Sequence, residues 1–294
     1  MYLGRTIRWT ENGIEVEGNE KHLKELLKCT GLEACRPVST PLTPEDLKDN
    51  KDNADEKKLD SGETKMYRKA TALIVYMAQD RPDLSMAACH LARYMQSPTQ
   101  ESWTRLKRVC RYLKGHPRCV MLYRWQSENR EVLKLQTDSD WANDSRTRKS
   151  HSGGVIMCGD HLLQHWSRIQ PVIALSSGEA ELYSSVCGLS RFAGLLNLLR
   201  ELRGETWGHP QHDVDASACK SILMRKGPGG VKHIDTKFLW VQELIRRKDI
   251  KVTKVVRTEN AADSLASYSA VNDLHYHLRL LRCQLRDVGG RVLC

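Results

Sequence analysis

The sequence has ten cysteines, but it lacks the paired spacings that are typical of a metal ribbon or a redox motif. No Cys-x-x-Cys pair occurs, and several cysteines fall inside apolar helical patterns, which argues against a zinc site or a disulfide frame. We therefore expect buried or free thiols in a reducing compartment. The sequence also shows no signal peptide, no apolar run of membrane-spanning length and no internal repeat, so we expect no membrane partner.

Basic residues are in excess. The chain has 294 residues, a formal net charge of +10 and 40% hydrophobic residues. This length suits about two domains, each with its own core. The positive charge indicates a polyanionic partner such as nucleic acid. The chain opens inside a strand-like pattern, Tyr2–Trp9, and we expect it to be a piece of a longer protein.

The first part, residues 1–126, is predicted to be mainly helical. It opens with a hairpin over residues 2–17 turned at Asn12-Gly13, and a helix over 20–29 ends before Gly31. Residues 43–65 are almost all polar or charged, so we predict a mobile loop there. Periodicity then predicts three helices and one strand, at residues 67–79, 84–95, 99–114 and 120–125.

The helix predicted at 99–114 carries basic residues around an apolar stripe. Arg105, Arg108 and Arg111 could contact nucleic-acid phosphates, because such contacts dominate nonspecific affinity. The alternative is a solvated helix face, and the helix pattern alone favours that alternative.

The second part alternates strands and helices. Three strands at 133–141, 153–158 and 162–166 are separated by short turns, which predicts an antiparallel meander. A long helix over 178–203 follows, and then come a strand, helices, a strand and a helix, at residues 213–216, 217–222, 235–247, 250–256 and 260–268. This order predicts an α/β mixed sheet with helices on both sides. Residues 271–294 form a tail without an evident role.

Four acidic residues stand at matching places on these elements. Asp138 follows a strand, Glu181 begins the long helix, Asp215 lies on the fourth strand, and Asp263 begins the last helix. Carboxylates that converge on one sheet edge repel each other, and all can be ionised only beside a cation. Carboxylate oxygens suit magnesium or manganese, and two such ions can promote phosphodiester hydrolysis.

Each of these acids also has a structural alternative. Glu179 stands three residues after Ser176, a capping-box spacing, which leaves Glu181 for the metal. Asp213 and Asp215 share a strand face, and one of them could be an exposed edge residue. Asp263 lies in a first helical turn, where any acid is favoured by the helix dipole. Each acid alone fits a structural role better, and only the order of the four acids on matching elements favours a catalytic role.

Several blocks of sequence resemble a known family. The segments Thr137–Asp144, Ala174–Tyr183 and Glu259–Asp263 are similar to the ribonuclease H domain of copia-type LTR retrotransposon Pol polyproteins, and so is Lys232-His-Ile-Asp235. Cys35–Leu42, Arg81-Pro-Asp83 and Arg108–Gly115 resemble the end of the reverse transcriptase, through its thumb and connection. The resemblance covers most of the chain, and the blocks occur in the family's order.

The resemblance implies a ribonuclease H-like, mixed five-stranded sheet with flanking helices over residues 130–270. It implies cleavage of the RNA strand of RNA–DNA hybrids, with Asp138, Glu181, Asp215 and Asp263 holding two Mg²⁺ ions that Mn²⁺ could replace. The implied partners are the hybrid and the rest of a Pol polyprotein. The implied location is the cytoplasm, within a virus-like particle, or else the nucleus.

The sequence departs from the family at four places. Gly178 stands where the family usually has threonine, and Ala216-Ser217 stands where it has a polar pair. The last block, which usually reads Ala-Asp-Ile-Leu-Thr-Lys, is Ala-Asp-Ser-Leu-Ala-Ser at Ala262–Ser267. No Tyr-x-Asp-Asp polymerase motif occurs. An inactive nucleic-acid-binding remnant of a decayed element is therefore the alternative function. His233 could orient substrate, but packing at a helix start is favoured. Arg148 and Lys149 could hold phosphates or belong to a solvated turn.

Overall fold

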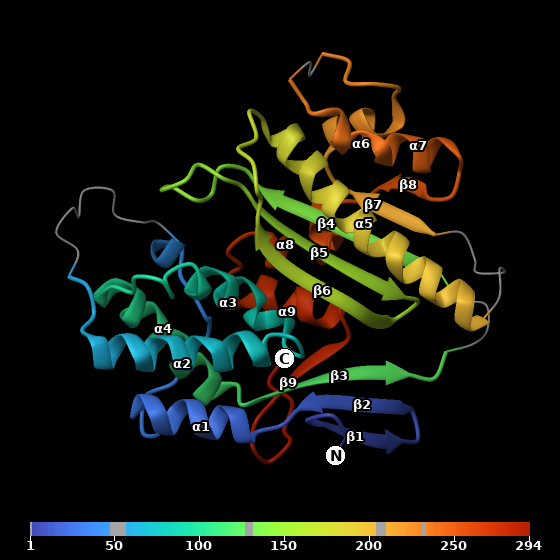
Figure 1. The fold of residues 1–294 in the computed structure, drawn as a ribbon. Coiled ribbons are helices and arrows are strands. Elements are labelled where there is room, and N and C mark those ends of the chain that lie inside the picture. Colours follow the sequence, from blue (N-terminus) through green and yellow to red (C-terminus); the bar gives the residue numbers. More distant parts are fainter. Residues whose placement is uncertain (1, 48–56, 127–131, 204–209, 231–232) are drawn as a thin grey trace. The chain divides into compact units, whose positions relative to one another are not determined.

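The computed structural model describes residues 2–47, 57–126, 132–203, 210–230 and 233–294. The chain divides into two compact units (Figure 1). The first unit comprises residues 1–125, 144–147 and 268–294, and the second comprises residues 126–143 and 148–267.

The first unit contains a four-stranded antiparallel sheet in the order β1-β2-β3-β9. Its strands are β1 (Arg5–Thr10), β2 (Gly13–Gly18), β3 (Arg118–Arg124) and β9 (Cys283–Arg286). The predicted hairpin is confirmed, and Gly13 is required because a side chain there would collide with the Tyr123 carbonyl. The tail, which had no predicted role, supplies β9. Three of these strands were predicted, but their pairing into one sheet with β9 was not, because β2, β3 and β9 are far apart in sequence.

The helices of the first unit lie close to their predicted positions. They are α1 (Lys21–Thr30), α2 (Ser61–Met77), α3 (Ser85–Ala92), α4 (Gln100–Gly115) and α9 (Val271–Leu280), with short 3-10 segments η1 (Glu45–Leu47) and η2 (Pro82–Leu84). Gly31 ends α1 in the left-handed conformation, as predicted. Large side chains such as Tyr67, Leu91 and Leu106 are fully buried among these helices.

The predicted mobile loop at 43–65 is wrong at its end. Helix α2 begins at Ser61 because Asp60 accepts a hydrogen bond from the Glu63 amide at 2.8 Å, while Glu63 accepts one from the Asp60 amide at 3.1 Å. This reciprocal pair is a capping box, and Asp60-x-x-Glu63 was visible in the sequence. Residues 48–56 of the predicted loop lie outside the described residues.

The second unit contains a mixed five-stranded sheet in the order β6-β5-β4-β7-β8. Its strands are β4 (Leu133–Asp140), β5 (His151–Cys158), β6 (His161–Ile169), β7 (Gln211–Val214) and β8 (Lys251–Lys254). Strands β4, β5 and β6 form the predicted antiparallel meander, whereas β4, β7 and β8 run parallel. The predicted α/β fold with five strands is confirmed.

Helix α5 (Ser177–Arg203) crosses one face of this sheet (Figure 1). Leu182, Leu189 and Phe192 on α5 share a buried core with Leu135 of β4 and Val214 of β7. The other elements are α6 (Ser217–Met224), η4 (Thr236–Phe238), α7 (Trp240–Arg246), η5 (Arg257–Glu259) and α8 (Asp263–Ala266). The predicted helix at 235–247 is therefore interrupted, and the predicted closing helix at 260–268 is shorter than expected.

By length and composition, the stretch Ser177–Leu202 of α5 could cross a membrane, and it is the one such helix among the described residues. The expectation that the chain has no apolar run of membrane-spanning length is therefore wrong. Leu182, Leu189 and Phe192 pack into the core of the sheet, and core helices commonly have this length and composition. The helix is therefore weak evidence for a membrane span.

Two glycines of α5 should respond oppositely to substitution by alanine. A Cβ at Gly188 would lie 2.6 Å from Thr137 Cγ2 and 3.2 Å from a Leu135 methyl group, whereas Gly194 has no neighbour within 4 Å. We expect Gly188→Ala to destabilise the protein by about 1–3 kcal/mol through overpacking. Gly194→Ala should stabilise it by about 0.5–1 kcal/mol through helix propensity.

The measurement is urea denaturation followed by circular dichroism, with both variants compared with the wild type. Equal effects of the two substitutions would contradict the close approach of α5 to β4.

Candidate metal centre

Three of the four predicted acids meet at one edge of the five-stranded sheet. Asp138 lies near the end of β4, Asp215 directly follows β7, and Glu181 lies in the first turns of α5. One carboxylate oxygen from each of the three lies within 4.8 Å of the others. Because β4 and β7 are parallel neighbours, their carboxyl ends reach the same edge, and α5 begins there. The topology therefore brings together residues 77 positions apart in sequence.

Burial makes this cluster electrostatically unfavourable without a cation. Asp138 and Glu181 are only 6% and 7% exposed. Burial raises the pKa of both carboxyl groups, and the charges of Asp138 and Asp215 raise the pKa of Glu181 further. Burial also raises the pKa of Asp215. A divalent ion would compensate the repulsion and the lost hydration together.

The hydrogen bonds of Glu181 also fit a metal ligand. Its Oε1 accepts bonds from the Ser139 amide at 3.1 Å and from the Ser139 hydroxyl at 2.9 Å. Its Oε2 is buried and has no hydrogen-bond partner among the described residues. A buried anionic oxygen without a donor is costly, and a hard cation would satisfy it. The donor set therefore fits Mg²⁺ or Mn²⁺.

The fourth predicted acid, Asp263, lies outside this group of three. It begins α8, and its Oδ1 accepts a bond from Arg257 Nε at 3.0 Å. Its charge nevertheless raises the pKa of Asp138, Asp140 and Asp215, so it lies near the cluster. The exposed Arg257 lowers the pKa of the same three groups. In this structure Asp263 is paired with a cation of the chain itself.

A buried polar network, which the sequence analysis missed, ties together the elements that carry the cluster. Thr137 Oγ1 of β4 lies 3.0 Å from His212 Nε2 of β7 and 3.3 Å from Ser185 Oγ of α5. Ser184 on α5 donates to the Asp138 carbonyl at 2.7 Å. Burial lowers the pKa of His212 to about 3, so this histidine is neutral. The network joins β4, β7 and α5 next to the residues that carry the carboxylates.

A second set of bonds attaches the segment before α8 to β4. Asn260 donates to the Thr137 carbonyl at 3.0 Å. Gln136 accepts from the Ala261 amide and donates to the Glu259 carbonyl, both at 3.2 Å. These bonds place Asp263 beside the cluster, because α8 begins two residues after Ala261.

Glu179 has the structural role that its spacing predicted. Its amide donates to the Ser176 hydroxyl oxygen at 3.2 Å, and its carboxylate accepts bonds from Tyr183 and the Leu175 amide. The same carboxylate lies 2.8 Å from His233 Nε2. The favoured role of His233 in packing is wrong, because its side chain is 46% exposed and pairs with Glu179.

Asp213 does not belong to the cluster and is not an exposed edge residue. It is almost completely buried, it accepts a bond from Gln211, and it lies 3.7 Å from Lys134 Nζ. The prediction that Asp213 or Asp215 could be an exposed edge residue is therefore wrong, because β7 lies inside the sheet between β4 and β8.

No family model matches the chain. It is 28% identical over 249 residues to the retrovirus-related Pol polyprotein from transposon TNT 1-94 of Nicotiana tabacum, covering 84% of this chain. It is also 28% identical over 274 residues to that of transposon RE2 of Arabidopsis thaliana, covering 90% of this chain. These homologues of the chain are retrovirus-related Pol polyproteins of plant transposons. It spans 18% of the length of each of these two relatives.

A shorter relative of this chain is the uncharacterized mitochondrial protein AtMg00810 of Arabidopsis thaliana. The two are 30% identical over 182 residues, which is 61% of this chain and 71% of the relative. Among solved structures, the chain is similar to the N-terminal RNase H domain of Rv2228c from Mycobacterium tuberculosis, which was fused to maltose-binding protein. The two are 16% identical with a TM-score of 0.32, and the match covers 50% of this chain and 96% of that chain. A score at this level carries no weight, so the fold rests on strand order and direction.

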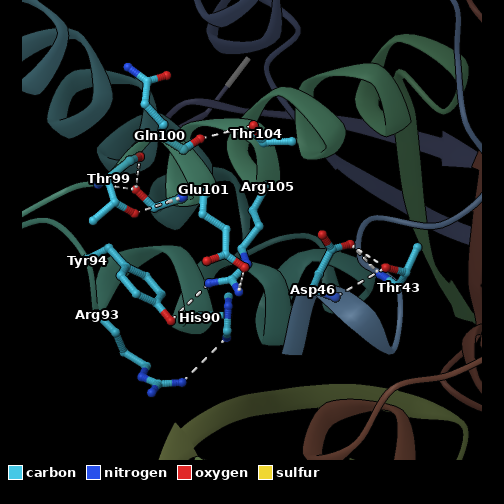
Figure 2. A network of polar contacts seen from close by, with 11 residues as sticks. Thr43, Asp46, His90, Arg93, Tyr94, Thr99, Gln100, Glu101, Thr104 and Arg105 are labelled. Atoms are coloured by element: carbon cyan, nitrogen blue, oxygen red, sulfur yellow. Dashed lines mark hydrogen bonds and ion pairs between the residues drawn. The ribbon is translucent and has the colours of Figure 1, made fainter. Parts of the chain in front are cut away.

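The predicted phosphate contact of Arg105 on α4 is not supported by the position of this side chain. Arg105 is 2% exposed, and it donates to the Tyr94 hydroxyl at 3.0 Å and to Glu101 at 2.7 Å (Figure 2). Arg108 donates to the Thr40 hydroxyl at 3.0 Å, and Arg111 donates to a main-chain carbonyl at 2.8 Å. Arg105 is therefore an internal bonding partner, whereas the contact of the half-buried Arg108 and Arg111 with phosphates stays a prediction.

The two basic residues after the meander's first strand differ in exposure. Arg148 is exposed and has a left-handed backbone with φ of 59°, whereas Lys149 is half-buried. Their contact with phosphates stays a prediction.

Replacing Arg105 should weaken the fold rather than nucleic-acid binding. Arg105→Ala removes the bonds from this buried guanidinium to Glu101 and Tyr94, and we expect a loss of about 2–4 kcal/mol in the free energy of unfolding. Lys107→Ala on the same helix should change it by less than about 0.5 kcal/mol. Chemical denaturation of both variants is the measurement, and a neutral Arg105→Ala would contradict the structural role.

The cluster also predicts how stability depends on pH when no metal is present. Because the pKa values of Asp138 and Glu181 are raised on folding, the folded state holds more protons than the unfolded state. Unfolded carboxyl groups titrate near pH 4, so stability should fall as the pH rises above about 4.

We expect Tm in EDTA to fall from about pH 5 to about pH 8, because repulsion grows as the carboxyl groups ionise. Asp138→Asn should make this fall shallower, and Mg²⁺ should reduce it in the wild type. The control Asp235→Asn, which removes an exposed acid outside the cluster, should leave the profile unchanged. A wild-type Tm that rises over this range would contradict the buried cluster.

Proposed function

We propose that the second unit is a metal-dependent endonuclease of the ribonuclease H type, which cleaves the RNA strand of RNA–DNA hybrids. The observation that supports it best is the group formed by the buried Asp138 and Glu181 with the half-buried Asp215, in which one oxygen of Glu181 has no partner among the described residues. The mixed sheet, the similarity to Pol polyproteins and the resemblance of several sequence blocks to ribonuclease H domains agree with this function.

The residues have separate roles in this proposal. Asp138, Glu181 and Asp215 hold Mg²⁺, and Asp263 stands beside them as a fourth carboxylate. When bound, such ions lower the pKa of a water molecule and neutralise charge on a phosphodiester. Ser139 orients Glu181 through two hydrogen bonds, and the network around Thr137 keeps the ligands in register. Arg257 holds Asp263 until substrate or metal competes for that carboxylate.

The charge distribution supports a nucleic-acid substrate. Residues 217–257, which follow Asp215, contain eleven lysines and arginines but only three acids. Such a local excess attracts a phosphate backbone by releasing counterions. A hybrid differs from duplex DNA in its 2′-hydroxyls and groove shape, which a site of this kind can distinguish. This basic segment lies apart from α4, Arg148 and Lys149, for which phosphate contact was predicted from the sequence.

The direct test is cleavage of a hybrid whose RNA strand carries an end label. We expect cleavage with Mg²⁺ or Mn²⁺ and none in EDTA. Asp138→Asn and Glu181→Gln should each lower the rate on the order of 10²–10³-fold, because each removes charge stabilisation at the centre. Asp263→Asn should cost less, since Asp263 lies outside the group of three.

Asp235→Asn is the matched control, because Asp235 is an exposed acid outside the cluster. Its rate should stay within about twofold of the wild type. Full cleavage by Asp138→Asn would exclude this site.

The pairing of Asp263 with Arg257 favours one alternative, a nucleic-acid-binding remnant without activity. It predicts salt-sensitive hybrid binding by the wild type without cleavage at any metal concentration. The same assay, run with a binding measurement, distinguishes the two functions.

A further inference from the structure

A separate cavity of about 410 Å³ lies in the second unit, and none of the three clustered carboxylates lines it. Its walls come from the end of β6, the side of α5 and the segment from η4 to the start of α7. Its size falls within the range of small-ligand sites. The lining side chains that define its chemistry are two arginines, three aromatic residues and one glutamine: Arg168, Arg191, Tyr183, Phe238, Trp240 and Gln170.

The charge on this cavity is uncompensated. No aspartate or glutamate lines it. Arg168 Nη1 donates to Cys187 Sγ at 3.6 Å, and the Arg191 guanidinium lies 5.0 Å from the centre of the Trp166 ring. Among the described residues, neither arginine has a carboxylate partner. Two such guanidinium groups on one cavity fit a phosphate, which accepts several bonds from arginine.

Three aromatic residues also line the cavity. The Tyr183 and Phe238 rings contact each other with centroids 4.7 Å apart and planes tilted by 59°. Trp240 is 39% exposed, so its ring is open to a ligand. A flat base can stack on such a ring, and stacking is largely independent of base identity.

Gln170 adds a buried hydrogen-bond acceptor to the lining. Its Nε2 donates to Ser152 Oγ and to the Ala180 carbonyl, both at 2.8 Å. Because a carbonyl only accepts, these bonds fix which way the amide points. Its Oε1 then has no partner among the described residues, although Gln170 is buried. This acceptor suits a ligand that carries an N–H group.

We propose that this cavity binds one nucleotide, with its base stacked on Trp240 and its phosphate held by Arg168 and Arg191. The site goes beyond the proposed nuclease function, because it uses no metal and none of the clustered carboxylates. A free mononucleotide and a nucleotide within a single strand share this chemistry, so the experiment includes both. Adenine is the base to test first, because its amino group can donate to an acceptor.

The test uses the full chain in EDTA, so that the carboxylate cluster holds no divalent ion. Fluorescence anisotropy follows a labelled single-stranded oligoadenylate, and unlabelled AMP serves as competitor. We expect the double variant Arg168→Ala/Arg191→Ala to bind the strand about tenfold or more weakly, because the charge-assisted bonds to the phosphate are lost. Trp240→Ala should weaken it by about tenfold, and Trp240→Phe should keep most of the affinity because it keeps a stacking ring.

The double variant Lys28→Ala/Arg200→Ala is the matched control, because it removes two exposed charges that do not line the cavity. It should bind within about twofold of the wild type. Displacement of the strand by AMP would identify a mononucleotide site, and strand binding that AMP cannot displace would identify a strand site.

Two results would overturn the proposal: equal losses in the two double variants, or wild-type affinity in Trp240→Ala. Circular dichroism and Tm of each variant show whether the fold is intact, and Trp240→Phe separates stacking from folding. Asp138→Asn should bind the strand normally while losing cleavage. Failure of the nuclease proposal therefore leaves the outcome of this test unaffected.

Discussion

The second unit depends on one electrostatic constraint, which is that several carboxylates are buried together at one sheet edge. Burial and mutual repulsion raise the pKa of Asp138 and Glu181, and a single donor residue, Ser139, satisfies only one oxygen of Glu181. Without a cation this arrangement is unfavourable, because burial and repulsion outweigh the hydrogen bonds and the Arg257 charge that favour the ionised forms. The cluster is therefore the feature that most needs a functional explanation.

The carboxylates are held in place by close contact between α5 and β4. Gly188 lets the helix approach Thr137 and Leu135, and Ser184 and Ser185 use that closeness for hydrogen bonds to β4. His212 completes the network from β7, and its burial keeps it neutral. Small and polar residues beneath the cluster thus define its geometry, while larger apolar residues such as Phe192 and Leu196 provide the core.

Several features were predictable because they depend on local sequence. The Asn12-Gly13 turn, the stop at Gly31 and the period-two pattern of β4 act over a few residues, and each is present in the structure. The start of α2 also depends on local sequence, since Asp60-x-x-Glu63 forms its capping box. It was not predicted, because the polar composition of this segment indicated a loop. The basic residues of α4 led to a wrong expectation for Arg105, because the charge of a residue does not reveal whether it is buried. Arg105 is a buried ion-pair partner of Glu101.

The sequence alone determined which acids could meet, because strand and helix order places Asp138, Glu181 and Asp215 at matching ends. Only the tertiary structure decided that Asp263 pairs with Arg257, that Asp213 is buried, and that His233 contacts Glu179. It also decided that Arg168 and Arg191 share a cavity with Trp240. The reason is physical: periodicity sets which face a residue occupies, whereas contacts between distant segments depend on how those faces pack.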